Sequence, residues 1–323
     1  MKKFEMKNGN KGLFLTMVLV LTLIFCACES DDATVDGVTD DEADCSDASV
    51  FAINLDASDC TVAIEALLGE TSQYEETEDG TTRSITMNSI ADHLVGEFPN
   101  AGNPNTISVQ SNSYTMTMAP ELATRTTGTG GFVSGILFSG VGIEPQTAES
   151  FMTSDGDVNR EWSFNALQST LPLGLDCNNA HVQPTGQYHY HGRASAYIEH
   201  LGIDGTEMVK VGYAADGFPI YYKYAYDDDG VTIVAYESGY QLIEGERPGD
   251  GETAPDGCYD GTYFADYEYV NGVSDLDACN GKMGKTPESD NEYYYVITDN
   301  FPSVPICFSG TPDDSFRFGG DGM

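Results

Sequence analysis

Basic side chains are scarce in this sequence. Its 323 residues include 14 lysines and arginines against 52 aspartates and glutamates, which gives a formal net charge of −38 at pH 7. Without residues 1–28 the balance is 10 basic against 51 acidic residues, or −41. Such a charge repels nucleic acid and anionic lipid headgroups, so we expect neither as a partner. Most of the carboxylates are expected to form a solvated face.

The familiar catalytic motifs are absent as well. The sequence contains no Gly-x-Ser-x-Gly, no phosphate-cradling glycine loop, no dinucleotide fingerprint and no His-Glu-x-x-His. Any hydrolase or redox activity would therefore have to rest on the histidines described below.

Helical patterns are also few. Only residues 161–167 and 194–201 carry a convincing helical periodicity, and no repeat with a solenoid or propeller period is present. Short strand-like runs dominate the rest, separated by glycine, proline, asparagine and aspartate. We therefore predict a mostly β fold, a sandwich or distorted barrel with long loops and a few short helices.

The N-terminus carries an apolar run that is too short to span a membrane. Four lysines precede apolar residues 13–25, and Cys26-Ala27-Cys28 follows, which is the order of a secretory signal. Cys28 is the better candidate for lipidation because the small Ala27 precedes it. The acidic residues after it resemble the surface-export signals of some Gram-negative lipoproteins. We predict a lipoprotein signal peptide over residues 1–28 and a lipid anchor at the outer membrane or cell surface, with simple secretion as the alternative.

Residues 29–83 are rich in aspartate, glutamate, serine and threonine. This composition buries little apolar surface. Within the segment, residues 50–55 alternate like a strand and residues 61–68 fit a short helix with one apolar face. We expect an acidic tether with a partly ordered appendage over residues 29–83, followed by one domain over residues 84–323.

A hairpin loop is predicted at Pro184-Thr185-Gly186. Proline suits the second position of a type I turn, and glycine takes the left-handed position that follows. In a three-residue loop of this kind Gln183 pairs with Gln187, which fixes the register of the two flanking strands.

That register gathers three of the five histidines in the chain. His181 lies opposite His189, and cross-strand partners have Cβ atoms roughly 4.5–5.5 Å apart. His189 and His191 are two residues apart on one strand, so the three imidazoles share a face. Tyr188 and Tyr190 point to the other face.

Three imidazoles on one face have the geometry of a metal site. Neutral imidazole suits copper or zinc, and also nickel or iron, and three protein ligands leave one position open for water or substrate. The alternative is a structural cluster in which each ring is hydrogen-bonded to the backbone and stacked on tyrosine.

Tyr188-His189-Tyr190-His191 is the signature of the bacterial YHYH-domain family. The similarity to that family covers roughly residues 85–310. Within this range, the other segments that resemble the family are residues 98–105, 174–176, 179–186, 216–221 and 276–281. The resemblance indicates where the domain begins and ends, but it does not imply a particular reaction.

The resemblance also bears on the ligand set. His93 occupies what looks like a family position, which makes it the candidate fourth member of the histidine group. Many relatives carry a histidine in the strand around Tyr294, where this chain has none. A ligand present elsewhere in the family could therefore be missing here.

Six cysteines follow the signal peptide, and an exported protein can join them in three disulfides. Six cysteines allow 15 connectivities. Cys279–Cys307 matches a pair of family positions, Cys45–Cys60 is the local choice, and Cys177–Cys258 is then left.

Asp176 and Asp216 are the candidate catalytic carboxylates. Either one could accept the second ring N–H of a ligating histidine, or act as a general base beside a metal-bound water. For Asp216, which precedes a glycine, ordinary turn chemistry is the simpler interpretation.

Two weaker patterns remain. Residues 155–161 place oxygen ligands at alternate positions, as calcium loops do, but lack the glycine and the glutamate of an EF-hand. Tyrosines within residues 221–226 and 267–269 could form a stacking platform for sugar rings, although such runs more often cover sheet faces.

Three functions are therefore open. The first is an exported lipoprotein that binds a divalent transition metal through the histidine cluster. The second is a glycan- or protein-binding surface module with structural histidines. The third is a metal-dependent enzyme that uses metal-bound water, with Asp176 or Asp216 as the base.

Overall fold

The histidine hairpin forms one edge of an eight-stranded sheet. A computed structural model describes residues 44–46 and 48–319, all within one compact unit. The sheet order is β17-β18-β12-β11-β5-β6-β10-β9, with parallel pairs at β10–β6 and β12–β18 and antiparallel pairs elsewhere. Its strands are β5 (Gly135–Leu137), β6 (Val141–Ile143), β9 (Ala180–Val182), β10 (Tyr188–Tyr190), β11 (Lys210–Ala214), β12 (Pro219–Tyr222), β17 (Gly281–Gly284) and β18 (Glu292–Ile297).

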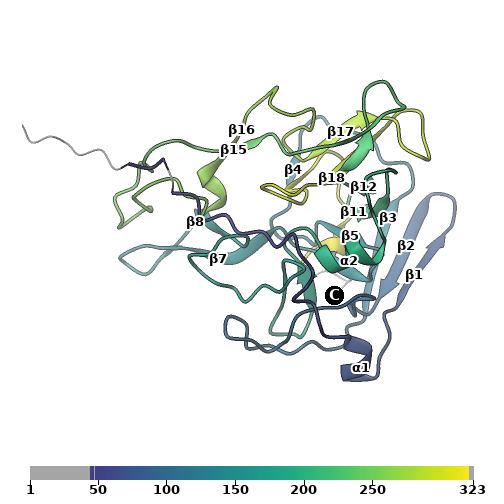
Figure 1. Cartoon of the computed structure of the whole chain (residues 1–323), viewed down its shortest axis with the longest axis horizontal. Helices are drawn as coiled ribbons and strands as arrows, with labels where there is room; N and C mark the ends of the chain where they lie inside the picture. The colour runs from purple at the N-terminus through teal and green to yellow at the C-terminus, as the bar shows by residue number, and fades with distance from the viewer. Residues whose placement is uncertain (1–43, 47, 320–323) are drawn as a thin grey trace, which may run out of the picture. The chain divides into compact units, whose positions relative to one another are not determined.

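Smaller sheets surround this one, and Figure 1 shows the β1–β2 and β7–β8 hairpins on opposite sides of the view. A three-stranded sheet contains β1 (Tyr74–Glu78), β2 (Thr82–Met87) and β3 (Asn112–Thr117). The two-stranded pairs are β7 (Gln146–Met152) with β8 (Val158–Asn165), β4 (Thr127–Gly128) with β19 (Cys307–Phe308), β13 (Tyr224–Tyr226) with β14 (Ile233–Ala235), and β15 (Tyr240–Leu242) with β16 (Tyr267–Tyr269).

In the part of the chain that the structure describes, helical structure is limited to short segments. They are α1 (Ile64–Leu68), α2 (Ser195–His200) and the 3-10 helices η1 (Phe264–Asp266) and η2 (Asp314–Phe316). The mostly β prediction is confirmed, and the large sheet curls into a half-barrel. Within the described residues no helix is long and apolar enough to span a membrane.

One helix prediction is wrong. Residues 161–167 contribute to β8, which pairs with β7. The aromatic side chains in this stretch alternate, and Trp162 and Phe164 both pack against Tyr263, with ring centroids 5.6 and 4.9 Å away. Packing of alternate, half-buried aromatic rings against Tyr263 therefore overrides the helical periodicity.

The main core lies around the histidine hairpin. Aliphatic side chains of β5, β6 and β11 pack there with the tyrosines of β10, and α1 and α2 contribute Ile64 and Tyr197. Tyrosine buries a large apolar ring but needs a hydrogen-bond partner for its hydroxyl group. The core therefore also has to contain polar groups, which are described with the site.

The N-terminal part of the described chain is bound into this domain. Val62 pairs with Val95, and Ile64 is buried in the main core. The expected boundary after residue 83 falls inside β2, so it does not coincide with a break in the structure. The expected signal peptide, the lipidation candidate Cys28 and residues 29–43 of the expected tether lie outside the described residues.

Two of the three expected disulfides are wrong. The chain forms Cys45–Cys258, Cys60–Cys177 and Cys279–Cys307, so only the last pair is as expected. The local pair Cys45–Cys60 fails because the segment between these cysteines runs extended across the domain. Its Val50 N–H donates to the Asp260 carbonyl at 2.7 Å, close to Cys258. Its Asn54 N–H donates to Asn179 Oδ1 at 2.7 Å, close to Cys177.

The histidine hairpin closes as predicted. The Gln183 N–H donates to the Gln187 carbonyl at 2.9 Å, and the Gly186 N–H donates to the Gln183 carbonyl at 2.8 Å. Gly186 has a φ of 88°, and His181 pairs with His189. The turn chemistry of the loop thus sets the register of both strands.

Replacing Gly186 with alanine is expected to destabilise the protein. A Cβ atom there would lie 2.0 Å from Ser108 Oγ and 2.9 Å from Ser108 Cβ, at a φ that favours glycine. Gly156 is a matched control, because its φ is +86° and no atom lies within 4 Å of its Cβ position. In urea unfolding with disulfides intact, Gly186→Ala should lose about 1–3 kcal/mol more than Gly156→Ala. Equal losses would contradict this account of the loop.

Candidate metal centre

Three histidine nitrogens meet at one point beside the hairpin. His191 Nε2 lies 3.1 Å from His189 Nε2 and 3.1 Å from His181 Nε2. The three rings have centroids 4.7 to 4.8 Å apart. Tetrahedral ligation with bonds of about 2.0–2.1 Å separates ligand nitrogens by roughly 3.3 Å. The spacing therefore fits a set of three ligands around one ion.

The outer nitrogens of two rings fix the tautomers. His181 Nδ1 lies 3.1 Å from the Leu173 carbonyl, and His189 Nδ1 lies 3.3 Å from the Gln187 carbonyl. A carbonyl only accepts, so each Nδ1 carries the hydrogen and each Nε2 presents a lone pair. This is the arrangement in which a second ring nitrogen orients a metal ligand.

The hydrogen-bond donors and acceptors of the three histidine rings do not match. His191 Nε2 faces two lone pairs, yet a neutral imidazole has one hydrogen to place on either of its nitrogens. His191 Nδ1 is buried and faces the backbone of Glu144 and Pro145 without a well-formed hydrogen bond. A structural cluster would need complementary donors and acceptors, whereas a cation at the common point satisfies all three lone pairs.

Burial keeps the three rings neutral. Desolvation lowers the pKa of His181 to about 4 and the pKa of His189 to about 4. It also lowers the pKa of His191 well below its ordinary value, with a further contribution from the two neighbouring rings. Metal binding at neutral pH would therefore face little competition from protons.

A carboxylate that the sequence did not single out lies beside the histidines. Glu144 directly follows β6, and its Oε2 is 3.7 Å from His189 Nε2. Gln183 Nε2 donates to Glu144 Oε2 at 2.7 Å, and Gln187 Nε2 contacts Oε1 at 3.4 Å. Burial raises the pKa of Glu144 to about 8. No sequence pattern separates this residue from the other acidic residues, because β6 reaches the hairpin only through sheet pairing.

The histidines and Glu144 line an open cavity of about 1040 Å³. The remaining wall is mostly apolar in area and carries few charges, and its polar groups are mainly amide and hydroxyl side chains, including those of the hairpin loop, β7 and β8. The common point of the three Nε2 atoms is thus reachable by a molecule much larger than water.

His93 is not part of the ligand group, so this prediction is wrong. Its Nδ1 lies 2.8 Å from the Leu94 carbonyl, and its Nε2 lies 2.6 Å from the Tyr190 hydroxyl group. Because the Nδ1 donates, the Nε2 accepts from Tyr190. Tyr190 points away from the histidine face, which places His93 on the opposite side of the strand.

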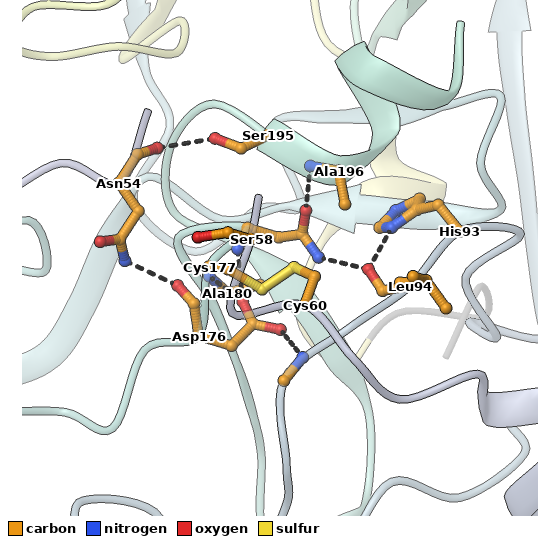
Figure 2. The surroundings of a disulfide bond; sticks show 12 residues. Asn54, Ser58, Cys60, His93, Leu94, Asp176, Cys177, Ala180, Ser195 and Ala196 are labelled. Atoms are coloured by element: carbon orange, nitrogen blue, oxygen red, sulfur yellow. Dashed lines mark hydrogen bonds between the residues drawn. A yellow bond between two sulfur atoms is a disulfide. The ribbon is translucent and has the colours of Figure 1, made fainter. Parts of the chain in front are cut away.

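The two candidate aspartates also lie elsewhere. Figure 2 shows Asp176 beside the Cys60–Cys177 disulfide. Its carboxylate accepts from the Tyr188 hydroxyl at 2.7 Å and from backbone N–H groups. Asp216 accepts from the Tyr295 hydroxyl at 2.6 Å and from the Gly310 N–H at 2.9 Å. Both carboxylates therefore accept hydrogen bonds from buried tyrosine hydroxyl groups rather than from the clustered histidines.

The weaker metal pattern gains no support. Residues 155–161 form the tip of the β7–β8 hairpin and the start of β8. In the described part of the chain, the only other convergent group is Cys60, Asp176 and Cys177, whose sulfurs are joined in a disulfide. Tyr294 lies in a separate core with its hydroxyl group unbonded, away from the histidine group.

This architecture is a β-rich domain with a histidine cluster that could hold a metal ion. The model of the family described as YHYH protein matches residues 113–310, which is more than half of the chain. The chain belongs to this family. The matched segment includes the three clustered histidines and Glu144 but not His93.

One curated protein is similar over a shorter stretch. An arginine–tRNA ligase from Thiobacillus denitrificans is 30% identical over 138 residues, which is 42% of this chain and 21% of that enzyme. The chain thus spans about a fifth of the length of that protein. No solved structure matches the chain.

The metal-free protein should be most stable near neutral pH. His181 and His189 have a pKa of about 4 when folded and about 6.5 when unfolded, so the unfolded chain binds more protons between these values. Stability is therefore present above pH 6.5 and lost as the pH falls towards 4, by roughly 2–3 kcal/mol for each ring. The pKa of Glu144 has the opposite effect: it is raised from 4.5 to about 8 in the folded protein, so its contribution to stability is lost as the pH rises between these values and continues to fall from pH 7 to 8.

Urea unfolding at pH 4.5, 7 and 9 measures both limbs of this profile. In His189→Gln the loss between pH 7 and pH 4.5 should be smaller than in the unmodified protein. A flat profile over this interval would mean that the histidines are not buried as neutral rings.

Proposed function

We propose that this protein binds one divalent transition-metal ion through His181, His189 and His191. The supporting observation is the convergence of three Nε2 atoms, two of which present lone pairs because backbone carbonyls fix the tautomers of His181 and His189. Three neutral nitrogen donors without thiolate suit copper or zinc. The fourth position opens to the cavity, so an exogenous ligand can reach the ion.

We further propose that the metal is bound outside the cytoplasm by a lipid-anchored protein. The signal-like N-terminus and Cys28 support this location, and three disulfides are typical of an oxidising compartment. The acidic surface would raise the local concentration of cations around the site. Aminoacylation is not proposed, because the similarity to the ligase covers a fifth of that enzyme and the chain's charge opposes RNA binding.

Metal analysis tests the site directly. The full chain, purified without chelator and without a histidine tag, should contain or take up about one equivalent of copper or zinc. The His189→Ala/His191→Ala variant should lose that equivalent. Elemental analysis combined with titration of the apoprotein provides the measurement.

His200 provides the matched control, because it is an exposed histidine at the end of α2, outside the cluster. His200→Ala should retain the full equivalent. A protein that stays empty after addition of copper and zinc would refute the metal proposal. The search would then turn to glycan or protein ligands.

The anchor is tested separately by Cys28→Ser. This change should remove the lipid and move the protein from the membrane fraction to the soluble fraction, while its metal content stays the same. Cys26→Ser should leave the protein in the membrane fraction. Mass spectrometry of the processed N-terminus checks both variants, and an unlipidated wild-type terminus would contradict the anchor.

A further inference from the structure

The site has features that are not needed to bind a metal ion. Three histidines suffice to hold the metal, yet a buried carboxylate lies beside them and a cavity of about 1040 Å³ opens over both. Sequestration of an ion needs neither feature. An open ligand position, a nearby carboxylate and space for an organic molecule are together the parts of a hydrolytic centre.

Glu144 lies beside the ligand set rather than within it. Its Oε2 is 3.7 Å from His189 Nε2, and it is not among the side chains whose donor atoms all lie within 4.8 Å of one another. Direct ligation by this rotamer would require it to approach all three nitrogens. A carboxylate at this place can instead accept a hydrogen bond from a water molecule on the open position.

The carboxylate is held in this orientation by two amides. Gln183 and Gln187 are the pair that closes the hairpin loop, and each directs its Nε2 at one oxygen of Glu144. The Glu144 N–H also donates to the Tyr190 carbonyl at 2.8 Å, which ties its backbone to β10. The strand that supplies two histidines therefore also fixes the acid, and such orientation is what a general base requires.

We propose that the metal centre is hydrolytic, with Glu144 as the general base for a water molecule on the open position and an uncharged ester or amide as the substrate. This inference rests on the proposed metal site. In the reaction, the water oxygen bonds to the carbonyl carbon while its proton passes to Glu144. The bond from that carbon to the leaving oxygen or nitrogen then breaks, and Glu144 returns the proton to the leaving group. The products are an acid and an alcohol or amine, and no electron donor or acceptor is needed.

The walls of the cavity indicate the charge of the substrate. Apart from the histidines, the titratable side chains among the lining residues are Glu144, Glu149 and Arg160. Most other polar groups there are amides and hydroxyls, which hydrogen-bond neutral acyl compounds. The net charge of −38 disfavours phosphate esters as substrates. A neutral carboxylic ester is therefore the appropriate probe.

The test uses the full chain loaded with one equivalent of zinc, and p-nitrophenyl acetate as the probe. The zinc protein should hydrolyse the ester at least tenfold faster than the same concentration of free zinc. Glu144→Gln keeps the shape and one accepting oxygen for the neighbouring amides but cannot take up the proton. It should lower kcat by about 100-fold with unchanged zinc content. Glu161→Gln, on the exposed part of β8, is the matched control and should stay within twofold.

The outcomes separate this inference from the metal proposal. Stoichiometric zinc binding without hydrolysis above free zinc would overturn the hydrolytic role and leave the metal site intact. A full rate in Glu144→Gln would overturn its role as the base. Faster hydrolysis of p-nitrophenyl phosphate than of the acetate would overturn the substrate class. Failure to bind zinc would overturn the hydrolytic inference, and failure to bind copper as well would also refute the metal proposal. Circular dichroism of Glu144→Gln distinguishes a folded variant from an unfolded one.

Discussion

The site depends on the two-residue side-chain period of the β9–β10 hairpin. A slip of one residue would turn the histidines into the core and the tyrosines into the cavity. Two buried hydroxyl groups oppose this slip, because Tyr188 donates to Asp176 and Tyr190 is bonded to His93 and Ser139. These partners lie on one side of the hairpin only. The alternation of tyrosine and histidine thus combines an anchoring face with a ligand face.

The ligand face is the side of the hairpin that carries His181, His189 and His191. Without a cation, the arrangement of these side chains is unfavourable in free energy. Three neutral rings converge without enough hydrogens between them, and a buried carboxyl group stands beside them with a raised pKa. A divalent ion would reverse the local electrostatics, because it attracts the ring lone pairs and favours the ionised form of Glu144. Rigid support from the tyrosine face explains how the fold maintains this arrangement.

The local structure of the hairpin could be predicted from the sequence, but the pairing of distant strands could not. The turn residues Pro184 to Gly186 sufficed to predict the hairpin and the shared face of the histidines, because both follow from strand geometry. Glu144 was missed because only sheet pairing brings β6 against β10. His93 was expected in the ligand group, and the role of Asp176 was left open, but both lie on the tyrosine face of the hairpin. There they accept hydrogen bonds from the hydroxyl groups of Tyr188 and Tyr190. The sequence pattern did not show that these hydroxyl groups are buried and need partners.

The disulfide connectivity limits the order in which the cysteines can pair. Cys45 and Cys60 are the first two of the six bridged cysteines, yet their native partners lie 213 and 117 residues further on. During synthesis these two thiols are present together long before either native partner. The nearest pairing is therefore a trap, and its release requires exchange with a later thiol. The native connectivity therefore requires disulfide exchange as well as oxidation once that first pair has formed.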